Sequence, residues 1–507
     1  MTAPTPDTRD EDTNTDWVRL HSDVRARFLR RLSEVLDSQI IPMLEGEAAE
    51  VAGYTSFLVQ RMASEDDSIP GVAAQLNAAM DREAGIATAF IEDIDMALAC
   101  QLAGQLDASR APGVPPEHRS RMLRGILGQA LRRLGNESGS EAEARMSAMA
   151  ALDHEWCDQR TAQIEARGRR ALDGIAAPQR ITAEAVTDFL RERFPEAPTA
   201  RCESVQLLPG GRSKHTLFLE LKDVPSLPGR VVMRQDGSSG IDTSVVDEAR
   251  TLASVQGAGL PVPQLLLCEA KDDRLGKPFI FMDRLSGAPA GSYFGFRDGD
   301  PGLLGSVAIL LAKLHALDVR GTPLAAAGGS GGARASILTE LAMQEAKWQR
   351  EAIEPSPIME YGFHWVRSNL HRIPDSAGIV HGDYRPHNLL VEGSRVTGLL
   401  DWEFTHVGDP AEDLAYIRPT VVPRMAWDEF MTAYVDAGGQ KHSEGTLRFY
   451  EAWNMIRLTA SGVAGTSRFL RGVTDDLCDG IGGYFILPIH ERIISENIRH
   501  AEASWAR

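Results

Sequence analysis

Apolar residues recur at helical spacing through the first third of the chain. Val24, Phe28 and Leu32, for example, fall four residues apart, which places them on one face of an α-helix. Two stretches rich in Pro or Gly, at 111–116 and 135–140, interrupt the pattern and separate one helix from the next. The pattern predicts four or five helices packed as a bundle. No combination of residues in this region indicates catalysis.

The middle of the chain has the shorter apolar runs that are typical of β-strands. Runs at 204–208, 216–221, 231–234 and 279–282 are bounded by Gly-, Pro- or polar-rich segments, which predicts four strands. One helix, from about 244 to 258, is predicted between the third and fourth of these strands.

Helical patterns return in the last part of the chain. Val307 and Leu314 lie on one predicted helical face, helices resume around 337–353, and the pattern beyond Asp413 is helical to the end. Between these helices, the small residues at 325–334 predict a mobile surface loop.

Two polar clusters in this region each follow a short apolar run that predicts a strand. The first contains His381, Asp383 and Asn388 in the spacing His-x-Asp-x-x-x-x-Asn, and the second begins with Asp401. Phosphoryl transfer with magnesium uses such a set. One carboxylate accepts the proton of the attacking hydroxyl, and an Asn and a second carboxylate hold the metal on the nucleotide phosphates. We therefore predict Asp383 as the catalytic base and Asn388 and Asp401 as ligands of Mg²⁺, with ATP as co-substrate.

The amino-acid sequences of these clusters resemble those of a known superfamily. His-Gly-Asp-Tyr-Arg-Pro-His-Asn-Leu-Leu at 381–390, Leu-Asp-Trp-Glu at 400–403 and Gly-Asp-Pro-Ala-Glu-Asp-Leu-Ala at 408–415 resemble the aminoglycoside phosphotransferase and choline kinase superfamily. The subgroup to which they are most similar comprises phosphotransferase modules fused to, or encoded near, acyl-CoA dehydrogenases. The resemblance covers residues from about 179 to 500 and leaves out the first third.

The resemblance and the pattern together predict an α+β protein. The expected architecture is a bilobal, protein-kinase-like fold with an added N-terminal all-α helical bundle. In chain order we expect a disordered tail, the helical bundle, a linker, a kinase-like N-lobe and a kinase-like C-lobe, at residues 1–16, 17–172, 173–180, 181–287 and 288–507.

The family pattern also implies a nucleotide-aligning pair and a hinge. By position, Arg234 and Glu248 are expected to align the nucleotide phosphates, although the family has Lys where this chain has Arg234. A strand-end Arg paired on the surface is the alternative for Arg234. The order of elements implies that the backbone near Met282 meets the adenine.

The segment Gly210-Gly211-Arg212-Ser213 lies between two predicted strands. Backbone N–H groups of Gly210 and Gly211 can cradle phosphate there, with a hydroxyl contact from Ser213. A simple hairpin turn is the alternative interpretation. We expect Lys214, which follows this segment, to be solvated.

For Arg385 two roles are possible, and the other residues of these clusters are expected to be structural. Arg385 can neutralise charge on the transferring phosphoryl group, or it can pair with a carboxylate of the loop. We expect His381 to brace the loop, His387 to face solvent, Trp402 to pack, and Asp413 to accept backbone hydrogen bonds.

Composition narrows the class of protein. The 507 residues carry a net charge of −18, from 53 basic and 71 acidic residues, which argues against a general binder of nucleic acid or of anionic membranes. Five cysteines lie far apart with no Cys-x-x-Cys pair, so neither a disulfide framework nor a zinc site is indicated. No stretch is long and apolar enough for a membrane span, and a cytoplasmic enzyme is expected.

These observations predict an ATP-dependent phosphotransferase that acts on a hydroxyl of a small molecule. The subgroup resemblance suggests a hydroxyacyl-CoA as acceptor. Because such a substrate is anionic, a basic rim is expected on the acceptor side of the cleft, to which Arg385, Arg457 and Arg468 can contribute. An antibiotic kinase of aminoglycoside or macrolide type is one alternative. A nucleotide-binding pseudokinase that recruits a partner is the other, supported by the missing Lys at Arg234. Homodimerisation through the helical bundle is left open.

Overall fold

The structure is a computed structural model, and the description below covers the residues whose placement it defines. These are 73, 76–114, 116–137, 139–165, 181–208, 214–237, 243–270, 275–292, 295–297, 300–318, 320–328, 331–353, 355–470 and 487–506. The predicted N-terminal tail, most of the first predicted helices, the linker and the segment 210–213 lie outside this set.

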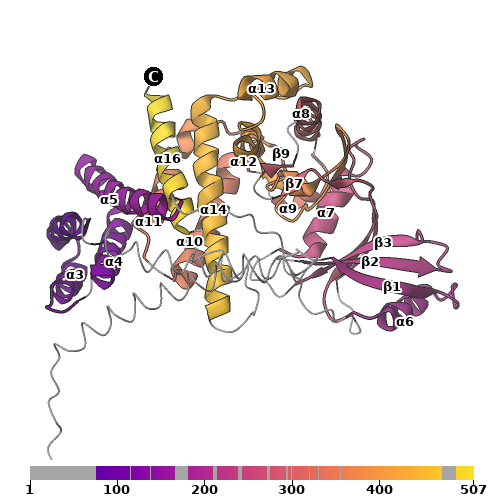
Figure 1. Cartoon of the computed structure of the whole chain (residues 1–507), viewed down its shortest axis with the longest axis horizontal. Helices are drawn as coiled ribbons and strands as arrows, with labels where there is room; N and C mark the ends of the chain where they lie inside the picture. The colour runs from indigo at the N-terminus through magenta and orange to yellow at the C-terminus, as the bar shows by residue number, and fades with distance from the viewer. Residues whose placement is uncertain are drawn as a thin grey trace, which may run out of the picture. The chain divides into compact units, whose positions relative to one another are not determined.

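The described residues divide into two compact units (Figure 1). The first comprises residues 73–165 together with two short segments from much later in the chain, 355–364 and 487–495. The second comprises the remaining described residues. The five-part division predicted from sequence stays a prediction, because it concerns boundaries that fall partly outside the described residues.

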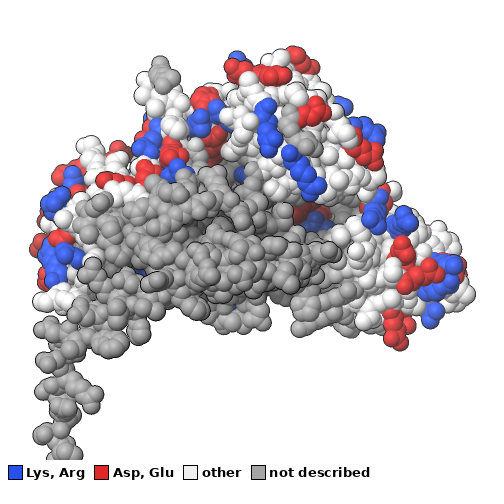
Figure 2. Space-filling model, in the orientation of Figure 1, with Lys and Arg blue, Asp and Glu red and all other residues white. Residues whose placement is uncertain are grey.

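Charged residues of both signs are interspersed over the described surface on the face shown in Figure 2. No helix among the described residues has an apolar stretch long enough to cross a membrane.

The first unit is helical, as predicted for this region. A helix over 76–92 is followed by α3 (Met96–Ser109), α4 (Pro116–Leu134) and α5 (Ser140–Glu165). Asp95 begins α3 as its N-cap, and its Oδ1 accepts a hydrogen bond from Leu98 N–H at 3.0 Å. The core between these helices is built from side chains such as Leu102, Ile126 and Met149, which are all buried.

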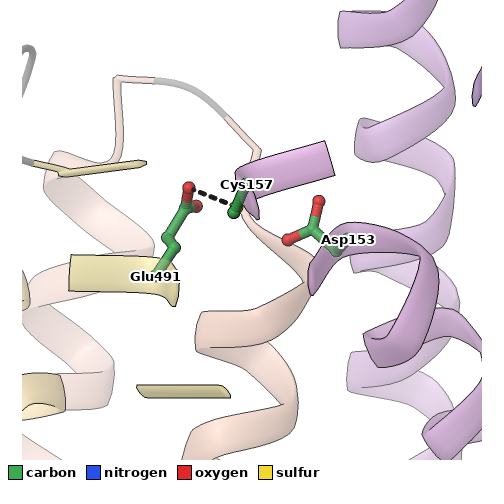
Figure 3. A group of neighbouring side chains, drawn as sticks. All are labelled: Asp153, Cys157 and Glu491. Atoms are coloured by element: carbon green, nitrogen blue, oxygen red, sulfur yellow. Dashed lines mark hydrogen bonds between the residues drawn. The ribbon is translucent and has the colours of Figure 1, made fainter. Parts of the chain in front are cut away.

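A buried charged cluster joins distant parts of the chain within this unit (Figure 3). Arg124 donates to Asp153 Oδ1 at 2.6 Å and to Glu491 Oε1 at 3.0 Å. The thiol of Cys157 donates to Glu491 Oε2 at 3.1 Å, and Ile358 N–H donates to Asp153 Oδ2 at 3.0 Å. Asp153 and Cys157 lie on α5, Ile358 on α11 (Pro357–Asn369) and Glu491 on α16 (Leu487–Trp505). The two carboxylates are thus matched by protein groups, which accounts for their burial without a bound cation.

The second unit begins with a five-stranded antiparallel sheet in the order β1-β2-β3-β5-β4. Its strands are β1 (Arg201–Leu208), β2 (Lys214–Lys222), β3 (Arg230–Asp236), β4 (Leu265–Glu269) and β5 (Phe279–Asp283). Four of them were predicted, and β4 was missed. Before the sheet comes α6 (Ala183–Arg193), and Thr182 is its N-cap, with Oγ1 accepting from Ala185 N–H at 3.2 Å.

The two faces of this sheet have different roles. Phe189 of α6 packs with Phe279, Phe281 and Met233 in an apolar core on one face. Because side chains alternate along a strand, Arg234 of β3 points to the opposite face. The helix α7 (Val245–Val255) packs against β3, β4 and β5. That second face is where the charged residues described below are found.

The larger part of the second unit is mostly helical, as predicted. Figure 1 shows α14 (Glu444–Leu470) running through it, and α14 packs against both α10 (Ala333–Glu351) and α12 (Ala411–Val421). The other α-helices of this part are α8 (Pro301–His315), α9 (Pro323–Gly328), α13 (Trp427–Asp436) and the later parts of α11 and α16.

Short strands carry the polar clusters of this part. β9 (Gly378–Val380) pairs with β12 (His406–Gly408), β10 (Leu389–Glu392) pairs with β11 (Arg395–Leu399) and β6 (Ala288–Pro289), and β7 (Gly291–Ser292) pairs with β8 (Gly295–Phe296). The predicted α+β class with a helical N-terminal region is therefore confirmed.

One predicted loop is wrong. Residues 325–334 were expected to form a mobile surface loop, but 325–328 belong to α9 and α10 begins at Ala333. Ala has the highest intrinsic helix propensity, and Thr322 supports the start of α9 by accepting a hydrogen bond from Ala326 N–H at 3.1 Å. Small residues alone were therefore a poor indicator of a loop here.

Candidate active site

The segment after β9 is held in place by one buried carboxylate. The backbone N–H groups of His381 and Gly382 donate to Asp413 Oδ2 and Oδ1, at 2.7 and 2.9 Å, which confirms the role predicted for Asp413. Gly382 has a φ of +81°, and a Cβ at this position would lie 2.5 Å from Phe404 O. Only Gly fits this turn without strain, and the turn determines where Asp383 lies.

His381 braces the same segment from inside. Its Nδ1 accepts a hydrogen bond from Asp383 N–H at 3.3 Å, and its Nε2 lies 3.0 Å from Leu400 O. Burial lowers the pKa of His381 despite the nearby carboxylates of Asp413, Asp383 and Asp401, which favour the charged ring. A neutral ring that bridges two loops matches the structural role predicted for His381.

The side chain of Asp383 is held through one of its two oxygens. Oδ2 accepts a hydrogen bond from Asn388 Nδ2 at 2.8 Å, and His387 Nε2 lies 3.4 Å from the same oxygen. Oδ1 is buried and has no hydrogen-bond partner within the described part of the chain. Burial favours the protonated acid, but the bond to His387 and the charges of His387 and Arg385 outweigh it, and the pKa of Asp383 is lowered.

The β10–β11 hairpin brings Asn388 close to Asp401. Leu389 pairs with Leu399 across the hairpin, and Leu400 N–H donates to Asn388 O at 2.9 Å. Asn388 Nδ2 donates to Asp383 O as well as to its carboxylate. Its Oδ1 accepts no hydrogen bond from the residues that the structure describes.

Asp401 has an unusual backbone conformation. Its φ is +66°, in the left-handed region that few residues other than Gly adopt. Such conformations persist only where the surroundings impose them, and they are concentrated at functional sites. The conformation turns the chain directly after β11 and leads to Glu403. We refer to residues 401–403 as the Asp401 turn.

Arg234 links the sheet to this turn. Its Nη1 lies 2.9 Å from Glu248 Oε1 on α7, and its Nη2 lies 2.9 Å from Asp401 Oδ1. Arg234 is only 9% exposed and lies within β3, so the alternative of a surface-paired Arg is wrong. Burial raises the pKa of Glu248, although the charge of Arg234 acts in the opposite direction. The structure thus brings together the pair that the family pattern implied.

Lys214 was predicted to be solvated, and this prediction is wrong. Its side chain is 2% exposed, and its Nζ donates to Thr243 O and lies 3.2 Å from Asp236 Oδ1 and 3.7 Å from Glu403 Oε2. The alternation of β2 contained a signal, because Lys214 shares a face with Thr216, which pairs with Arg234.

The remaining predicted site residues lie as follows. The guanidinium of Arg385 lies over the ring of Tyr416, 4.1 Å from its centroid, and is largely buried. His387 faces Asp383 and not simply solvent, which corrects the expectation for it. Met282 lies within β5, between β3 and β4, opposite Val232. Gly210, Gly211 and Ser213 lie outside the described residues.

Arg457 was expected at a basic rim, and that expectation is also wrong. It is buried, donates to Gly382 O at 2.8 Å and lies 3.4 Å from Glu412 Oε1. Glu412 Oε2 lies 3.3 Å from His406 Nε2. Arg457 therefore stabilises the segment next to Asp383 through its hydrogen bond to Gly382 O. Sequence reasoning missed Glu412 and His406, because a lone Glu or His on a helix or strand has no distinctive local pattern.

Trp402 packs as predicted. It is buried, and its Nε1–H donates to Leu399 O at 3.0 Å. Its indole thus closes the Asp401 turn back onto β11.

Comparison with known proteins assigns this arrangement to a class. Residues 204–453 match the "Phosphotransferase enzyme family". The chain is 30% identical over 251 residues to viomycin phosphotransferase of Streptomyces vinaceus, which covers 47% of this chain and 80% of that protein. Residues 204–453, which include the five-stranded sheet and the segment with Asp383, therefore form a phosphotransferase domain.

The chain belongs to the phosphotransferase enzyme family. It is also 29% identical over 261 residues to acyl-CoA dehydrogenase family member 10 of Mus musculus, covering 48% of this chain but only 22% of that protein. The chain thus spans about a fifth of that relative's length. Among solved structures, it is similar to macrolide 2'-phosphotransferase type I, with 20% identity, a TM-score of 0.44, and coverage of 61% of this chain and 98% of that one.

Proposed function

We propose that this protein is an ATP-dependent phosphotransferase that moves the γ-phosphoryl group to a hydroxyl of a small molecule. The observation that carries the proposal is the state of Asp383. One carboxylate oxygen is held by Asn388, while the other is buried and has no partner among the described residues. A buried acceptor of this kind is what a base needs in order to receive a proton from a substrate.

The proposed proton transfer uses Asp383 Oδ1. The acceptor hydroxyl donates its hydrogen bond to this oxygen. The proton moves to Asp383 as the hydroxyl oxygen bonds to the γ-phosphorus atom, and the bond from that phosphorus to the bridging oxygen breaks, so that ADP leaves. Because the pKa of Asp383 is lowered, the carboxylate is ionised at neutral pH and ready to accept the proton. General-base assistance of this kind typically contributes about 10²–10⁴-fold in rate.

The residues beside Asp383 fit a magnesium-bound nucleotide. Asn388 Oδ1 and Asp401 are hard oxygen ligands, which suit Mg²⁺, and Asn388 Oδ1 accepts no other hydrogen bond from the described residues. When bound, Mg²⁺ supplies the charge that neutralises the phosphate oxygens. Arg234, aligned by Glu248, is proposed to contact the phosphates.

For the acceptor we propose a hydroxyacyl-CoA. The support is the likeness to relatives named acyl-CoA dehydrogenase family members 10 and 11. Phosphorylation converts a hydroxyl into a good leaving group, which would prepare a hydroxyacyl chain for elimination. The proposed location is the cytoplasm.

An antibiotic acceptor is the second candidate, and the likeness to viomycin phosphotransferase favours it. The charged groups near Asp383 are of both signs, including Arg385, Arg457 and Glu412, so charge alone does not choose between the candidates. Against the pseudokinase alternative, Arg234 is paired with Glu248, and an Arg at this position was the alternative's only support.

The test is a transfer assay with the full chain, Mg²⁺ and either ATP or GTP. Acceptors would be hydroxyacyl-CoAs, aminoglycosides, macrolides, peptide antibiotics, amino alcohols and sugars, with the phosphorylated product identified by mass spectrometry. We expect transfer to a hydroxyacyl-CoA. The D383N variant should lose at least about 100-fold in kcat while binding nucleotide as tightly as the wild type.

Two results would contradict the proposal. Turnover that is unchanged in D383N would remove Asp383 as the base. Transfer to an antibiotic with none to any hydroxyacyl-CoA would replace the acceptor by the second candidate and leave the reaction class in place.

A further inference from the structure

Lys214 is a buried cation close to the Asp401 turn. Its Nζ lies 3.7 Å from Glu403 Oε2 and 3.2 Å from Asp236 Oδ1, and it also donates to Thr243 O. We propose that Lys214 is a positioning residue. By holding Glu403, it keeps the Asp401 turn against the β-sheet, where Asp401 can serve the metal-bound nucleotide. This inference rests on the proposed function.

The spacing of the charges on the two sides supports the proposal. Lys214 pairs with Asp236 across β2 and β3, and Asp236 is two residues beyond Arg234, so both cations lie on one face of the sheet. Their partners, Asp401 and Glu403, are also two residues apart. Two cations of the sheet therefore meet two carboxylates of the turn, with Arg234 on Asp401 and Lys214 on Glu403.

Lys214 and Arg234 differ in how they are expected to interact with a bound ligand. The ammonium group of Lys214 donates to Thr243 O and Oγ1, and it makes ion-pair contacts with Asp236 and Glu403. Thr243 Oγ1 also donates to Glu403 Oε2 at 3.1 Å, so Thr243 links Lys214 to Glu403 by hydrogen bonds in addition to their ion pair. With its side chain only 2% exposed, Lys214 is suited to fixing the turn.

Arg234 and Asp401, in contrast, are expected to interact directly with the ligand. Both are proposed to contact the metal-bound nucleotide, so their mutual ion pair must be shared with the ligand when it binds. A link between sheet and turn that does not itself contact the ligand would keep Asp401 in place during that exchange. The Lys214–Glu403 pair is such a link, because neither residue is among the proposed ligands.

The test compares four variants by nucleotide binding and by kinetics. K214M removes the charge and keeps much of the length, K214R restores a charge, E403Q removes the partner charge, and K222M is the control. Lys222 lies at the other end of β2, and its side chain is 55% exposed. The binding probe is a fluorescent ATP or GTP analogue, whichever the wild type binds more tightly, titrated against Mg²⁺.

We expect K214M and E403Q each to raise the Mg²⁺ concentration needed for half-maximal nucleotide binding by about 10–100-fold, as is usual for residues that support metal ligands. K214R should recover part of the loss, and K222M should behave as the wild type. The double variant K214M/E403Q should bind no more weakly than either single variant, because both changes remove one interaction.

Circular dichroism at the assay temperature shows which variants are folded. A folded K214M, or a folded E403Q if K214M does not fold, that keeps the wild-type Mg²⁺ dependence would overturn the inference and leave the proposed function intact. Additive losses in the double variant would also overturn it. A wild-type chain that binds neither nucleotide would instead contradict the proposed function, and the inference with it.

Discussion

Arg234 Nη2 lies 2.9 Å from Asp401 Oδ1, although the two residues are 167 positions apart in the chain. The same guanidinium holds Glu248 through Nη1. A planar group with two separate donor sites can satisfy two carboxylates at once, whereas a Lys ammonium is a single point charge. Arg at this position of β3 therefore joins α7, the sheet and the Asp401 turn through one side chain.

Replacing Arg234 by Met should strongly destabilise the fold. The change leaves the buried carboxylate of Glu248 and the partly buried one of Asp401 without their cation, and breaking a buried pair in this way typically costs about 3–5 kcal/mol. R234K should be intermediate, because its ammonium cannot reproduce both contacts. Urea denaturation gives the free energy of unfolding of each variant.

R230M is the matched control for this prediction. Arg230 begins the same strand, but its side chain is 74% exposed and 3.9 Å from Glu220, so its loss should change stability by less than about 0.5 kcal/mol. Equal stability of R234M and R230M would contradict the importance of the buried pair.

The pH dependence of transfer should respond to His387. Its bond to Asp383 helps to lower the pKa of that carboxylate, so the base stays ionised as the pH falls below neutrality. In H387A the pKa of Asp383 should rise, and the acid limb of kcat/KM should move to higher pH. The measurement is a kcat/KM profile over the pH range in which circular dichroism shows a folded protein.

H371A serves as the control for the pH profile, because His371 is exposed and its Nδ1 contacts only the nearby Ser368 O. An H387A profile that superimposes on that of H371A would show that His387 does not influence the base.

His406 should make stability depend on pH on the alkaline side. Burial disfavours its charged form, but the adjacent Glu412 outweighs this and raises the pKa of His406 to about 9, from an ordinary value of 6.5. A raised pKa stabilises the fold fully below pH 6.5, and that contribution is lost as the pH rises through about 9. Its size is on the order of 3 kcal/mol.

The corresponding measurement is the free energy of unfolding of wild type and H406Q at several pH values between 6 and about 9.5. Wild-type stability should fall across this interval more steeply than that of H406Q. Parallel curves for the two proteins would mean that His406 is not charged in the folded state.

Cys157 should be unreactive in the folded protein. Burial and the neighbouring Glu491 and Asp153 raise its pKa well above the ordinary value, and the thiolate is the reactive form. Cys100 is exposed and should be alkylated by iodoacetamide under native conditions at neutral pH. Peptide mass spectrometry would check both, and native labelling of Cys157 at the rate of Cys100 would contradict the buried cluster.

Predictions made from contiguous sequence were the most successful. The N-cap of α6 shows how local such features are, because it depends only on the Thr182 side chain and an amide three residues later. The four predicted strands follow from short apolar runs bounded by Gly-, Pro- or polar-rich segments. β4 (Leu265–Glu269) was missed, although it is an apolar run as long as β5 and follows prolines at 261 and 263. The loop expected at 325–334 was wrong because helix propensity outweighed residue size.

Predictions about charged residues were less reliable. Lys214 and Arg457 were expected near solvent, yet both are buried against carboxylates that are far away in the chain. A charged side chain is buried only where a partner reaches it, and nothing in the local sequence identifies that partner. His387 was likewise expected to face solvent, yet it lies beside Asp383.

The sequence by itself determined the local pattern of this protein. It specified the spacing of His381, Asp383 and Asn388, the strands that precede Asp383 and Asp401, and the class of reaction that such residues perform. Only the tertiary structure decided which cation meets which carboxylate, with Arg234 on Asp401 and Lys214 on Glu403. The physical reason is that secondary structure follows from interactions over a few residues, whereas an ion pair depends on how strands from one part of the chain are packed against a turn from another.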